Sequence, residues 1–287
     1  MTGEFTIISP LGTELELFDN KYFTLDDIEG QTEINNSISS SKISGADGET
    51  VNNVVTDVRP LVFTLTINEN IDVEEAKRYI LQYVKSKHNH TIKWKRNNKT
   101  LEIVGLCEKI VMARWQQGIA MQITFFCGQA YWEDAENIVN EISAIKDMHY
   151  FAKGKGKMLY FALGSPRPLG VYDTIRTRTF NNTGDSDVGM IIEITALAKV
   201  KNPAIYASTD EFIGVDNVEM KSGDVIRINT NKGQKDITLN GVSILDKIKI
   251  GSTFLQLEIG NNTFTISSDD NNLTSVYFNL IYKQRYV

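Results

Sequence analysis

The stretch Asp224–Leu245, DVIRINTNKGQKDITLNGVSIL, carries a strong signal for β-structure. Apolar and polar residues alternate over 224–230 and again over 235–239, which is the period of a half-buried strand. Asn240-Gly241 follows, and this dipeptide accepts the two positive φ angles of a type I′ hairpin turn. Asn231-Lys-Gly233 marks another turn. The stretch therefore predicts consecutive antiparallel strands joined by short turns.

The rest of the second half shows the same alternation, with a further turn at Gly260-Asn261. Together these segments make about seven short strands at a spacing of about 8–12 residues, which is typical of a β-sandwich or a jelly roll. The additional strands are expected at 188–197, 242–245, 254–259, 262–267 and 275–283.

The first half combines strands with one clear helix. Asp72 is a suitable N-cap, and Glu75 follows three residues later as in a capping box. Val73, Ala76, Ile80 and Val84 then recur at helical spacing, which predicts a helix that ends near residue 86.

Other segments of the first half are assigned by composition and alternation. Residues 32–54 are rich in Ser, Asn and Gly and predict a long surface loop, and 133–147 predicts either a second helix or an ordered linker. Strands are expected at 61–67, 91–95, 101–106 and 119–126.

A length of 287 residues favours two domains. Residues 1–150 hold 14 Lys and Arg against 22 Asp and Glu, whereas residues 151–287 hold 16 against 14, so the charge balance changes near residue 150. The lysine- and glycine-rich segment Ala152–Lys157 is typical of a flexible connector. We therefore expect a domain over 1–135, a linker over 136–157 that is helical in part, and a β-sandwich over 158–287.

Composition excludes several classes of protein. With 41% hydrophobic residues the chain is expected to fold, and a net charge of −6 argues against a generally basic nucleic-acid binder. The only cysteines, Cys107 and Cys127, lie in strand-like segments, which predicts buried, unreactive thiols and a reducing compartment. The N-terminus lacks the pattern of a secretory signal, and no apolar run reaches the about 18–20 residues that a membrane span needs.

The motifs of common enzymes are missing from the sequence. It contains no GxSxG, Walker A, GxGxxG or HExxH pattern, so neither catalytic residues nor a cofactor is expected. His88 and His90 would face the same side of a strand, but no third zinc ligand is nearby. Asp185-Ser-Asp187 and Asp269–Asn272 lack the ligand spacing of a calcium loop and are more simply turns between strands. No bound metal is therefore expected.

A run of basic residues distinguishes the first half. Residues 76–101 contain eight Lys and Arg and no acid, and Lys93, Lys95 and Arg96 cluster at one strand. Three interpretations remain open: a solvated face, a nucleic-acid surface, or a contact with the acidic residues of another copy. The acidic partner residues would be Asp26, Asp27 and Glu29.

The order of several short motifs resembles the distal tail proteins of siphophages and related tail-like particles. Each motif is weak alone, but together they span nearly the whole chain. In the first half the motifs are Gly45-Ala-Asp-Gly48, Asp57-Val-Arg59, Phe125-Phe126 and Tyr131-Trp132-Glu133. In the second half they are Phe180–Gly184, Asn202-Pro203, Gly223-Asp224, Asn229-Thr230, Thr238–Gly241, Leu257–Asn261 and Tyr282–Tyr286.

The resemblance implies a mainly β protein with a structural role. It implies a barrel-like N-terminal domain with one helix that forms a homohexameric ring around the tail lumen, and a C-terminal sandwich like a galectin or a carbohydrate-binding module. The partners it implies are the tail tube and the tip, hub or baseplate proteins, with a receptor-binding protein docked at the periphery. DNA would pass through the lumen without specific binding, and assembly would take place in the cytoplasm of the bacterial host. The long insertions with which some members bind host saccharides are missing here.

Two other functions remain as alternatives. A carbohydrate-binding adhesion module would use exposed aromatic residues of the sandwich, although residues 133–287 contain no Trp. A peptidase or hydrolase of a tail tip would need a nucleophile and base, or a metal, and the sequence offers neither set.

Overall fold

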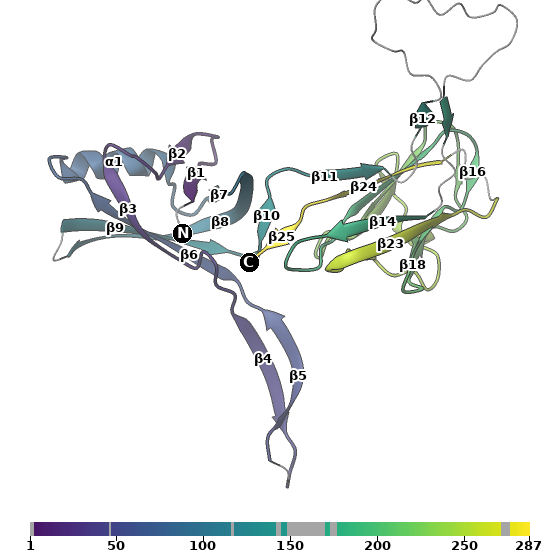
Figure 1. Cartoon of the computed structure of the whole chain (residues 1–287), viewed down its shortest axis with the longest axis horizontal. Coiled ribbons are helices and arrows are strands. Elements are labelled where there is room, and N and C mark those ends of the chain that lie inside the picture. The colour runs from purple at the N-terminus through teal and green to yellow at the C-terminus, as the bar shows by residue number, and fades with distance from the viewer. Residues whose placement is uncertain are drawn as a thin grey trace, which may run out of the picture. The chain divides into compact units, whose positions relative to one another are not determined.

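The computed structural model describes residues 3–45, 47–115, 118–141, 145–147, 170–172, 177–270 and 276–287. The chain divides into two compact units, and the mainly β fold class is confirmed (Figure 1). Unit 1 consists of Met1–Glu136 with Arg285–Val287, and unit 2 consists of Asn137–Gln284. The connector segment Ala152–Lys157 lies outside the described residues.

Unit 1 is built on one nine-stranded sheet. Seven of its strands follow the order β2-β1-β7-β8-β9-β6-β3, and β10 and β25 pair at its side. No pairing among the described residues joins β2 to β3, so the sheet is open rather than a closed barrel. The strands are β1 (Glu4–Ile8), β2 (Glu14–Glu16), β3 (Phe23–Glu29), β6 (Arg59–Ile67), β7 (Asn89–Arg96), β8 (Lys99–Trp115), β9 (Gly118–Cys127), β10 (Trp132–Asp134) and β25 (Arg285–Tyr286).

Strand β8 lets this sheet curve around a single core. Residues 99–106 pair with β7, residues 106–115 pair with β9, and a bulge between Cys107 and Lys109 lies within the pairing with β9, while β10 pairs at Leu101 and Glu102. Alternate residues point inward along each strand, as the sequence pattern predicts. The largest fully buried side chains include Trp94, Trp132, Phe5, Phe23, Phe63 and Phe125.

The predicted helix is confirmed as α1 (Val73–Tyr83). The main-chain N–H of Glu75 donates to a carboxylate oxygen of Asp72 at 3.2 Å, so Asp72 is the N-cap. Ala76 and Ile80 are buried, and Val84 at the C-cap is buried as well. The apolar stripe therefore attaches the helix to the core of unit 1.

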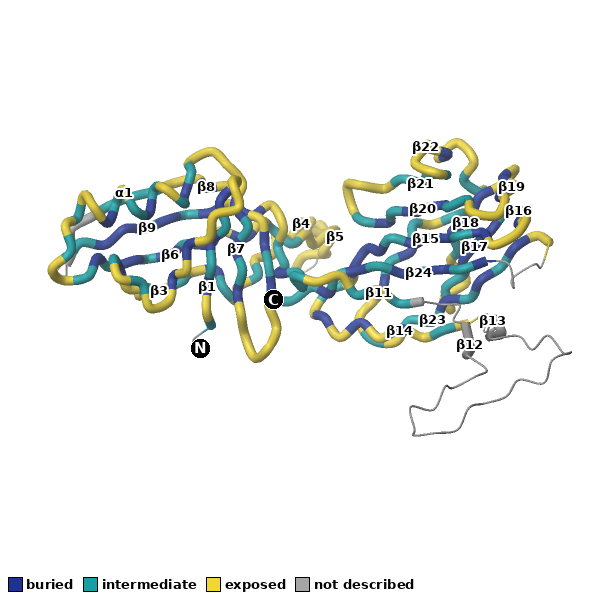
Figure 2. Tube along the Cα trace, turned by 90° about the horizontal axis from the view of Figure 1, so that it is seen from above, coloured by how far each residue is buried: buried dark blue, intermediate teal, exposed yellow. Residues whose placement is uncertain are grey.

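The prediction of a surface loop over 32–54 is wrong. Strands β4 (Asn36–Lys42) and β5 (Glu49–Thr56) pair there as a two-stranded hairpin, which we call the ribbon. It extends away from the sheet of unit 1 in Figure 1, and its residues are exposed along nearly its whole length, as the colour of β4 and β5 in Figure 2 indicates. The Ser- and Asn-rich composition suggested a loop, but a strand with both faces in contact with solvent tolerates Ser and Asn. Such a strand is defined by its main-chain hydrogen bonds alone.

Unit 2 contains two main sheets around a second core. The six-stranded sheet has the order β11-β24-β15-β20-β21-β22, and the four-stranded sheet has the order β14-β23-β17-β18. Minor pairs are β16 with β19 and β12 with β13. The strands are β11 (Ile138–Glu141), β12 (Ile145–Asp147), β13 (Gly170–Tyr172), β14 (Thr177–Asn182), β15 (Ile191–Ala196), β16 (Val200–Lys201), β17 (Ala204–Ala207), β18 (Phe212–Gly214), β19 (Glu219–Met220), β20 (Val225–Asn229), β21 (Asp236–Leu239), β22 (Val242–Ser243), β23 (Gly260–Ser267) and β24 (Val276–Tyr282).

The type I′ turn predicted at Asn240-Gly241 is present in unit 2. Asn240 and Gly241 both have positive φ, +50° and +83°, and they connect β21 to β22 as the type I′ turn requires. Two expectations are wrong. Residues 254–259 form no strand and contribute only the bridge of Leu257 to Val188. Of the two alternatives for 133–147, the helix is the wrong one: the described part contains strands, because β11 gains main-chain partners by pairing with β24.

Candidate assembly surfaces

The ribbon is tied to the sheet by a buried arginine. Arg59, only 3% exposed, donates from Nε to the carbonyl of Ala130 at 2.7 Å. Its Nη1 donates to the carbonyls of Gln31 at 2.7 Å and Gly30 at 3.3 Å. Burial lowers the pKa of Arg59, and the remaining nitrogen, Nη2, has no hydrogen-bond partner among the described residues. These bonds join the chain entering the ribbon to the chain leaving it.

Gly30 makes this close approach possible. Its φ is +82°, and a Cβ at this position would lie 1.9 Å from the carbonyl oxygen of Pro60. Any other residue would push apart the two chain segments at the base of the ribbon, near Gly30 and Pro60. A small cavity of about 80 Å³ lies at this base, and the carboxylates of Glu29, Glu33 and Asp57 are among its lining groups.

The acidic residues expected at an interface lie on the edge strand β3. Asp26 occupies the bulge between Leu25 and Asp27 and accepts a hydrogen bond from the Thr66 hydroxyl. Asp27 accepts from the main-chain N–H of Ile28 at 2.9 Å, and Glu29 ends the strand. A cleft of about 680 Å³ runs along this edge, where Asp26 and Asp27 join Leu17, Phe18 and Phe23.

The basic residues expected at an interface lie on β7, where Lys93 and Lys95 share the outer face and Arg96 lies on the side of Trp94. Lys95 is 2.8 Å from Glu4 of the same chain, which raises the pKa of Lys95 by hydrogen bonding and charge. Arg96 lies 5.4 Å from the centre of the Trp94 ring, and Lys93 stands opposite Glu102 of β8.

The sheet keeps these two groups of charges apart. Strands β8, β9 and β6 separate the basic strand β7 from the acidic strand β3. Residues within each group are brought together, but the two groups do not meet within one chain. Among the described residues, no ion pair joins the two groups within one chain.

An apolar surface that sequence reasoning missed lies on the outward side of the same sheet. It consists of Pro60, Val104, Leu106 and Phe126, all exposed, and we call it the outer patch. Phe126 of β9 pairs directly with Leu106 of β8 on one side and with Pro60 of β6 on the other. Its signal in the sequence is that both phases of 101–106 and 119–126 contain apolar residues, whereas a strand with one solvated face should alternate.

Of the described histidines, neither His88 nor His90 belongs to a group of side chains that could hold a metal ion. His90 is buried, accepts from the Lys85 main-chain N–H at Nε2, and has Nδ1 2.9 Å from the carbonyl of His88. Both ring nitrogens are therefore engaged, while His88 is exposed. Burial lowers the pKa of His90 below its usual range.

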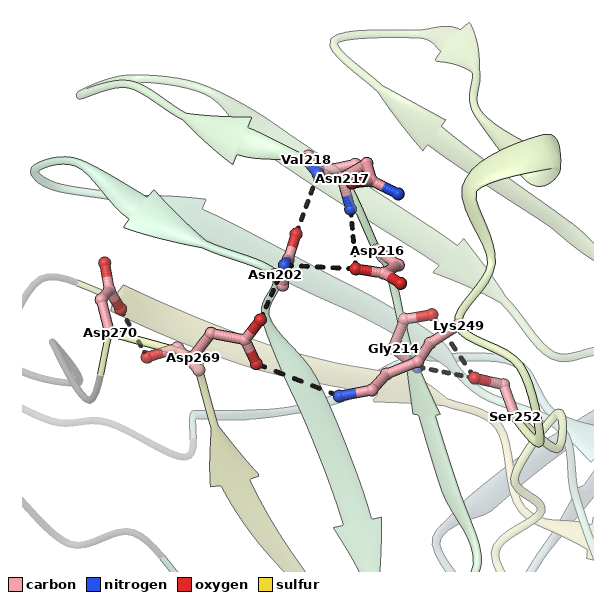
Figure 3. A network of polar contacts seen from close by, with 10 residues as sticks. Asn202, Gly214, Asp216, Asn217, Val218, Lys249, Ser252, Asp269 and Asp270 are labelled. Atoms are coloured by element: carbon pink, nitrogen blue, oxygen red, sulfur yellow. Dashed lines mark hydrogen bonds and ion pairs between the residues drawn. The ribbon is translucent and has the colours of Figure 1, made fainter.

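The aspartates proposed as turn residues are engaged by neighbours. Figure 3 shows Asp269 between the side-chain amide of Asn202, 2.7 Å away, and the ammonium group of Lys249, 4.0 Å away. Asp187 accepts from the main-chain N–H of Ile259 at 3.1 Å. The described residues include no group of three or more His, Cys, Asp or Glu side chains that could hold a metal ion.

Both cysteines are buried, as expected. Burial raises the pKa of Cys107, and it raises the pKa of Cys127 to about 12. Neither thiol is poised to ionise near neutral pH.

Several motif residues of unit 2 tie loops to the sandwich core. Asn182 is buried, donates to the carbonyls of Ser186 and Leu257, and accepts from the N–H of Gly184 at 3.0 Å. Thr230 is also buried and exchanges two hydrogen bonds with the main chain of Met190. These short motifs therefore have a structural explanation, which is that they satisfy main-chain groups where strands end.

Part of the second unit matches a known family. Residues 183–286 match the family model of the siphovirus-type tail component, C-terminal domain. We call residues 183–286 the tail component domain after this match. The match confirms the resemblance to phage distal tail proteins stated from the sequence motifs. Comparison with curated proteins finds no match.

Solved structures share the fold of the whole chain. The crystal structure of the phage SPP1 Dit protein, gp 19.1, is described as a paradigm of the hub adsorption apparatus in phages that infect Gram-positive bacteria. It aligns with a TM-score of 0.68 at 13% identity over 99% of this chain and 99% of that one. A chain of the phage P2 baseplate in its activated conformation with Ca aligns at 12% identity and a TM-score of 0.47, over 100% of both chains.

Within the tail component domain, Asn202 forms hydrogen bonds to neighbouring loops. Its φ is +48°, a conformation that Asn tolerates better than most residues. Its side chain accepts from the N–H of Val218 at 2.9 Å and donates to Asp216 at 3.3 Å as well as to Asp269 (Figure 3). One side chain thus joins three loops at one end of the sandwich.

The four-stranded sheet of unit 2 carries a row of hydroxyl and aromatic side chains. Thr177, Thr265, Tyr206 and Phe212 stand in one row across the four-stranded sheet. Tyr206 and Phe212 stack on each other with centroids 5.2 Å apart, and Thr177 and Thr265 hydrogen-bond to each other at 2.9 Å.

Among the helices that the structure describes, none has the length and apolar character needed to cross a membrane.

Proposed function

We propose that this chain is a non-enzymatic structural component of a phage tail or phage-like particle. It forms a homohexameric ring that joins the tail tube to the tip or baseplate, and it docks peripheral proteins, including a receptor-binding protein. The match of residues 183–286 to the tail component family carries the proposal, and the fold shared over the whole length with a tail hub protein supports it.

The charges of unit 1 favour a ring. Acids on β3 and cations on β7 occupy separate regions of one sheet, with three strands between them. A ring uses a heterologous interface, in which one surface of each subunit meets a different surface of the next. Opposite charges on two separate surfaces suit such an interface and speed its formation. The open edges β2 and β3 also need cover, which neighbours in a ring supply.

The remaining properties fit the same role. A net charge of −6 lets DNA pass through a lumen without adhering, because binding to phosphate relies on Lys and Arg. The chain would assemble in the cytoplasm of the bacterial host and end in the virion tail. The hydrogen-bonded motif residues hold loops in place, and such a rigid domain suits a docking platform.

The test is the assembly state of the purified protein. Native mass spectrometry and electron microscopy, with and without the tail-tube protein, should show rings of six copies. A protein that remains monomeric at high concentration with the tail-tube protein present would contradict the proposal.

A carbohydrate-binding adhesion module is the second candidate. The half-exposed Tyr206, in a row with Thr177 and Thr265, is the observation that favours it. Against it, Tyr206 stacks on Phe212, so the pair does not offer two free ring faces to a sugar. Binding of cell-wall saccharide fragments that is lost in Tyr206→Ala would favour this function over a purely structural one.

A further inference from the structure

A cleft of about 680 Å³ follows the open edge of β3, and we call it the edge cleft. Its lining comes mainly from residues 23–28 of β3, from Gly3 and Phe5 at the start of the chain, and from residues 17–20, which follow β2. Because β2 and β3 are the two ends of the strand order, the edge cleft marks where the curved sheet stays open. Its volume falls within the range of about 300–1,000 Å³ that is typical of ligand sites.

The edge of β3 that borders the cleft has no strand partner in the described chain. Strand β3 pairs with β6 alone, so one row of its main-chain N–H and C=O groups is left without a neighbouring strand. An extended segment that lies against such an edge gains main-chain hydrogen bonds and adds a strand to the sheet. The main chain of β3 therefore favours an extended peptide over a compact ligand.

Part of the lining of the edge cleft is apolar. Phe5, Leu17 and Phe23 line it and are at most 2% exposed, whereas Phe18 is 52% exposed. Successive side chains of an added strand point to opposite faces, so every second residue would lie over these apolar groups. The occupant should therefore carry apolar side chains at alternate positions.

One buried polar atom in the lining lacks a partner. The side-chain amide nitrogen of Gln31, Nε2, makes no hydrogen bond in the described part of the chain. The main-chain carbonyl of Gln31 is already used, since Arg59 and Trp132 both donate to it. A buried donor without an acceptor destabilises the folded chain, and a main-chain carbonyl of a bound peptide would supply the acceptor.

The charges of the edge cleft select a basic occupant. Asp19, Asp26 and Asp27 are among its lining residues, which include no Lys or Arg. The bulge at Asp26 and these charges also keep β3 from pairing with the β3 of another copy, because like charges would face each other. A segment with Lys or Arg between its apolar residues would meet the acids with opposite charge.

The described strands of this chain offer no such segment. Strand β7 has the pattern, since Lys93 and Lys95 alternate with Ile92 and Trp94, but β1 and β8 occupy both its edges. Its cations can approach the acids of β3 as side chains, as in the proposed ring, but its main chain cannot pair with that of β3. Each edge strand among the described residues contains at most one Lys or Arg.

We propose that the edge cleft binds an extended basic segment of a different tail protein, which adds as a strand beside β3. The apolar side chains of the segment pack on the apolar lining, its Lys or Arg side chains meet the three acids, and one of its carbonyls accepts from Nε2 of Gln31. The chemistry of the occupant is read from the cleft, whereas its source in another tail protein rests on the proposed function.

A synthetic peptide provides the test of this chemistry. The probe is the capped, labelled heptapeptide KVKVKVK, in which the valines alternate with lysines. One control, KKVVVKK, has the same composition without the alternation, and the other, KVKPKVK, has a central proline that interrupts a strand. Fluorescence anisotropy with the full-length protein should show binding of the probe at least tenfold tighter than that of either control. Bound probe should also slow hydrogen exchange of the main-chain amides in residues 23–28.

Charge variants locate the binding site. Asp26→Asn together with Asp27→Asn removes two charges at nearly unchanged shape and should weaken binding of the probe at least tenfold. Glu74→Gln together with Glu75→Gln changes the net charge equally at two exposed acids of α1 and should leave binding close to wild type. Thermal melting of both double variants checks that the protein still folds.

Two further variants separate binding from folding. Gln31→Met removes the unpartnered amide, so it should weaken binding of the probe severalfold without lowering the melting temperature. Phe18→Ala removes an exposed ring of the lining and should weaken binding as well. Leu11→Ala is its control, because Leu11 is 82% exposed and lies outside the lining of the edge cleft.

The outcomes separate this inference from the proposed function. If the probe binds no tighter than KKVVVKK, or if the Asp26 and Asp27 double variant binds it as well as wild type does, the inference is overturned. If assembled rings exclude the probe completely, a second copy fills the edge cleft, so the ring stands and the inference is overturned. If no ring forms under any condition, the proposed function fails, and binding of the probe by the monomer still decides the chemistry of the cleft.

Discussion

The Nη1 atom of Arg59 donates a hydrogen bond to the main-chain carbonyl of Gln31 at 2.7 Å, across the base of the ribbon. Because the same side chain also binds Gly30 and Ala130, one buried guanidinium fixes where the ribbon leaves the sheet.

Replacing Arg59 with Met should destabilise unit 1 by about 2–4 kcal/mol, since buried carbonyls would lose their donors. Urea denaturation measures this loss. Hydrogen exchange should also show faster exchange of main-chain amides at 31–57. Arg78→Met, at an exposed arginine of α1, is the matched control and should change stability little. Equal stability of the two variants would show that Arg59 does not hold the ribbon.

The buried His90 should make stability depend on pH. Burial lowers its pKa in the folded protein, so the unfolded chain takes up a proton near pH 6.5 while the folded chain does not. Stability should therefore fall as the pH drops below about 6.5. His90→Gln should remove this part of the dependence, and His88→Gln, at an exposed position, should keep it. Melting temperatures measured from pH 5 to 8 provide the test. Parallel curves for wild type and His90→Gln would show that His90 does not cause the pH dependence.

Reversing the charge of Lys93, Lys95 and Arg96 to Glu should weaken ring formation without unfolding the monomer. The association that remains should depend less on salt, because fewer charges attract across the interface. Light scattering at several salt concentrations measures both effects. Reversal of Lys199, Lys201 and Lys221 in unit 2 is the control with the same change in charge. If the two triple variants assemble equally well, β7 does not contribute to the interface.

Asn202→Ala should lower the stability of unit 2 by about 1–3 kcal/mol. The substitution leaves the Val218 N–H without its acceptor and removes the amide donor to Asp269.

A chelator should leave the melting temperature of the wild-type protein unchanged, because Asn202 and Lys249 engage Asp269. A fall of more than a degree or two on chelation would instead mean that a metal is bound.

Trypsin should cut first between Lys153 and Lys157, where the sequence is basic and rich in glycine.

A fragment of residues 137–284 should fold and melt at a higher temperature than a fragment of 158–284. The shorter fragment lacks β11, which pairs with β24 at the edge of the six-stranded sheet. Circular dichroism of the two fragments provides the comparison, and equal melting temperatures would show that β11 adds nothing.

Elements with local signals could be predicted from the amino-acid sequence alone. The helix cap at Asp72, the turn at Asn240-Gly241 and the inward residues of β6 to β9 all follow from side chains near one another in the chain. The tail-family motifs were readable for the same reason, because residues such as Asn182 and Asn202 bond to main-chain groups beside strand ends.

Which surfaces stay uncovered depends on how distant strands pair in three dimensions. Ser- and Asn-rich residues 36–56 resemble a loop in composition, and pairing alone makes them a ribbon with Val54 and Val55 on opposite faces. The outer patch joins Pro60 to Phe126 and Leu106, residues far apart in the sequence that meet only through the register of three strands. Strand order likewise keeps the acids of β3 away from the cations of β7. Such relationships depend on long-range hydrogen-bond register, which local residue preferences do not encode.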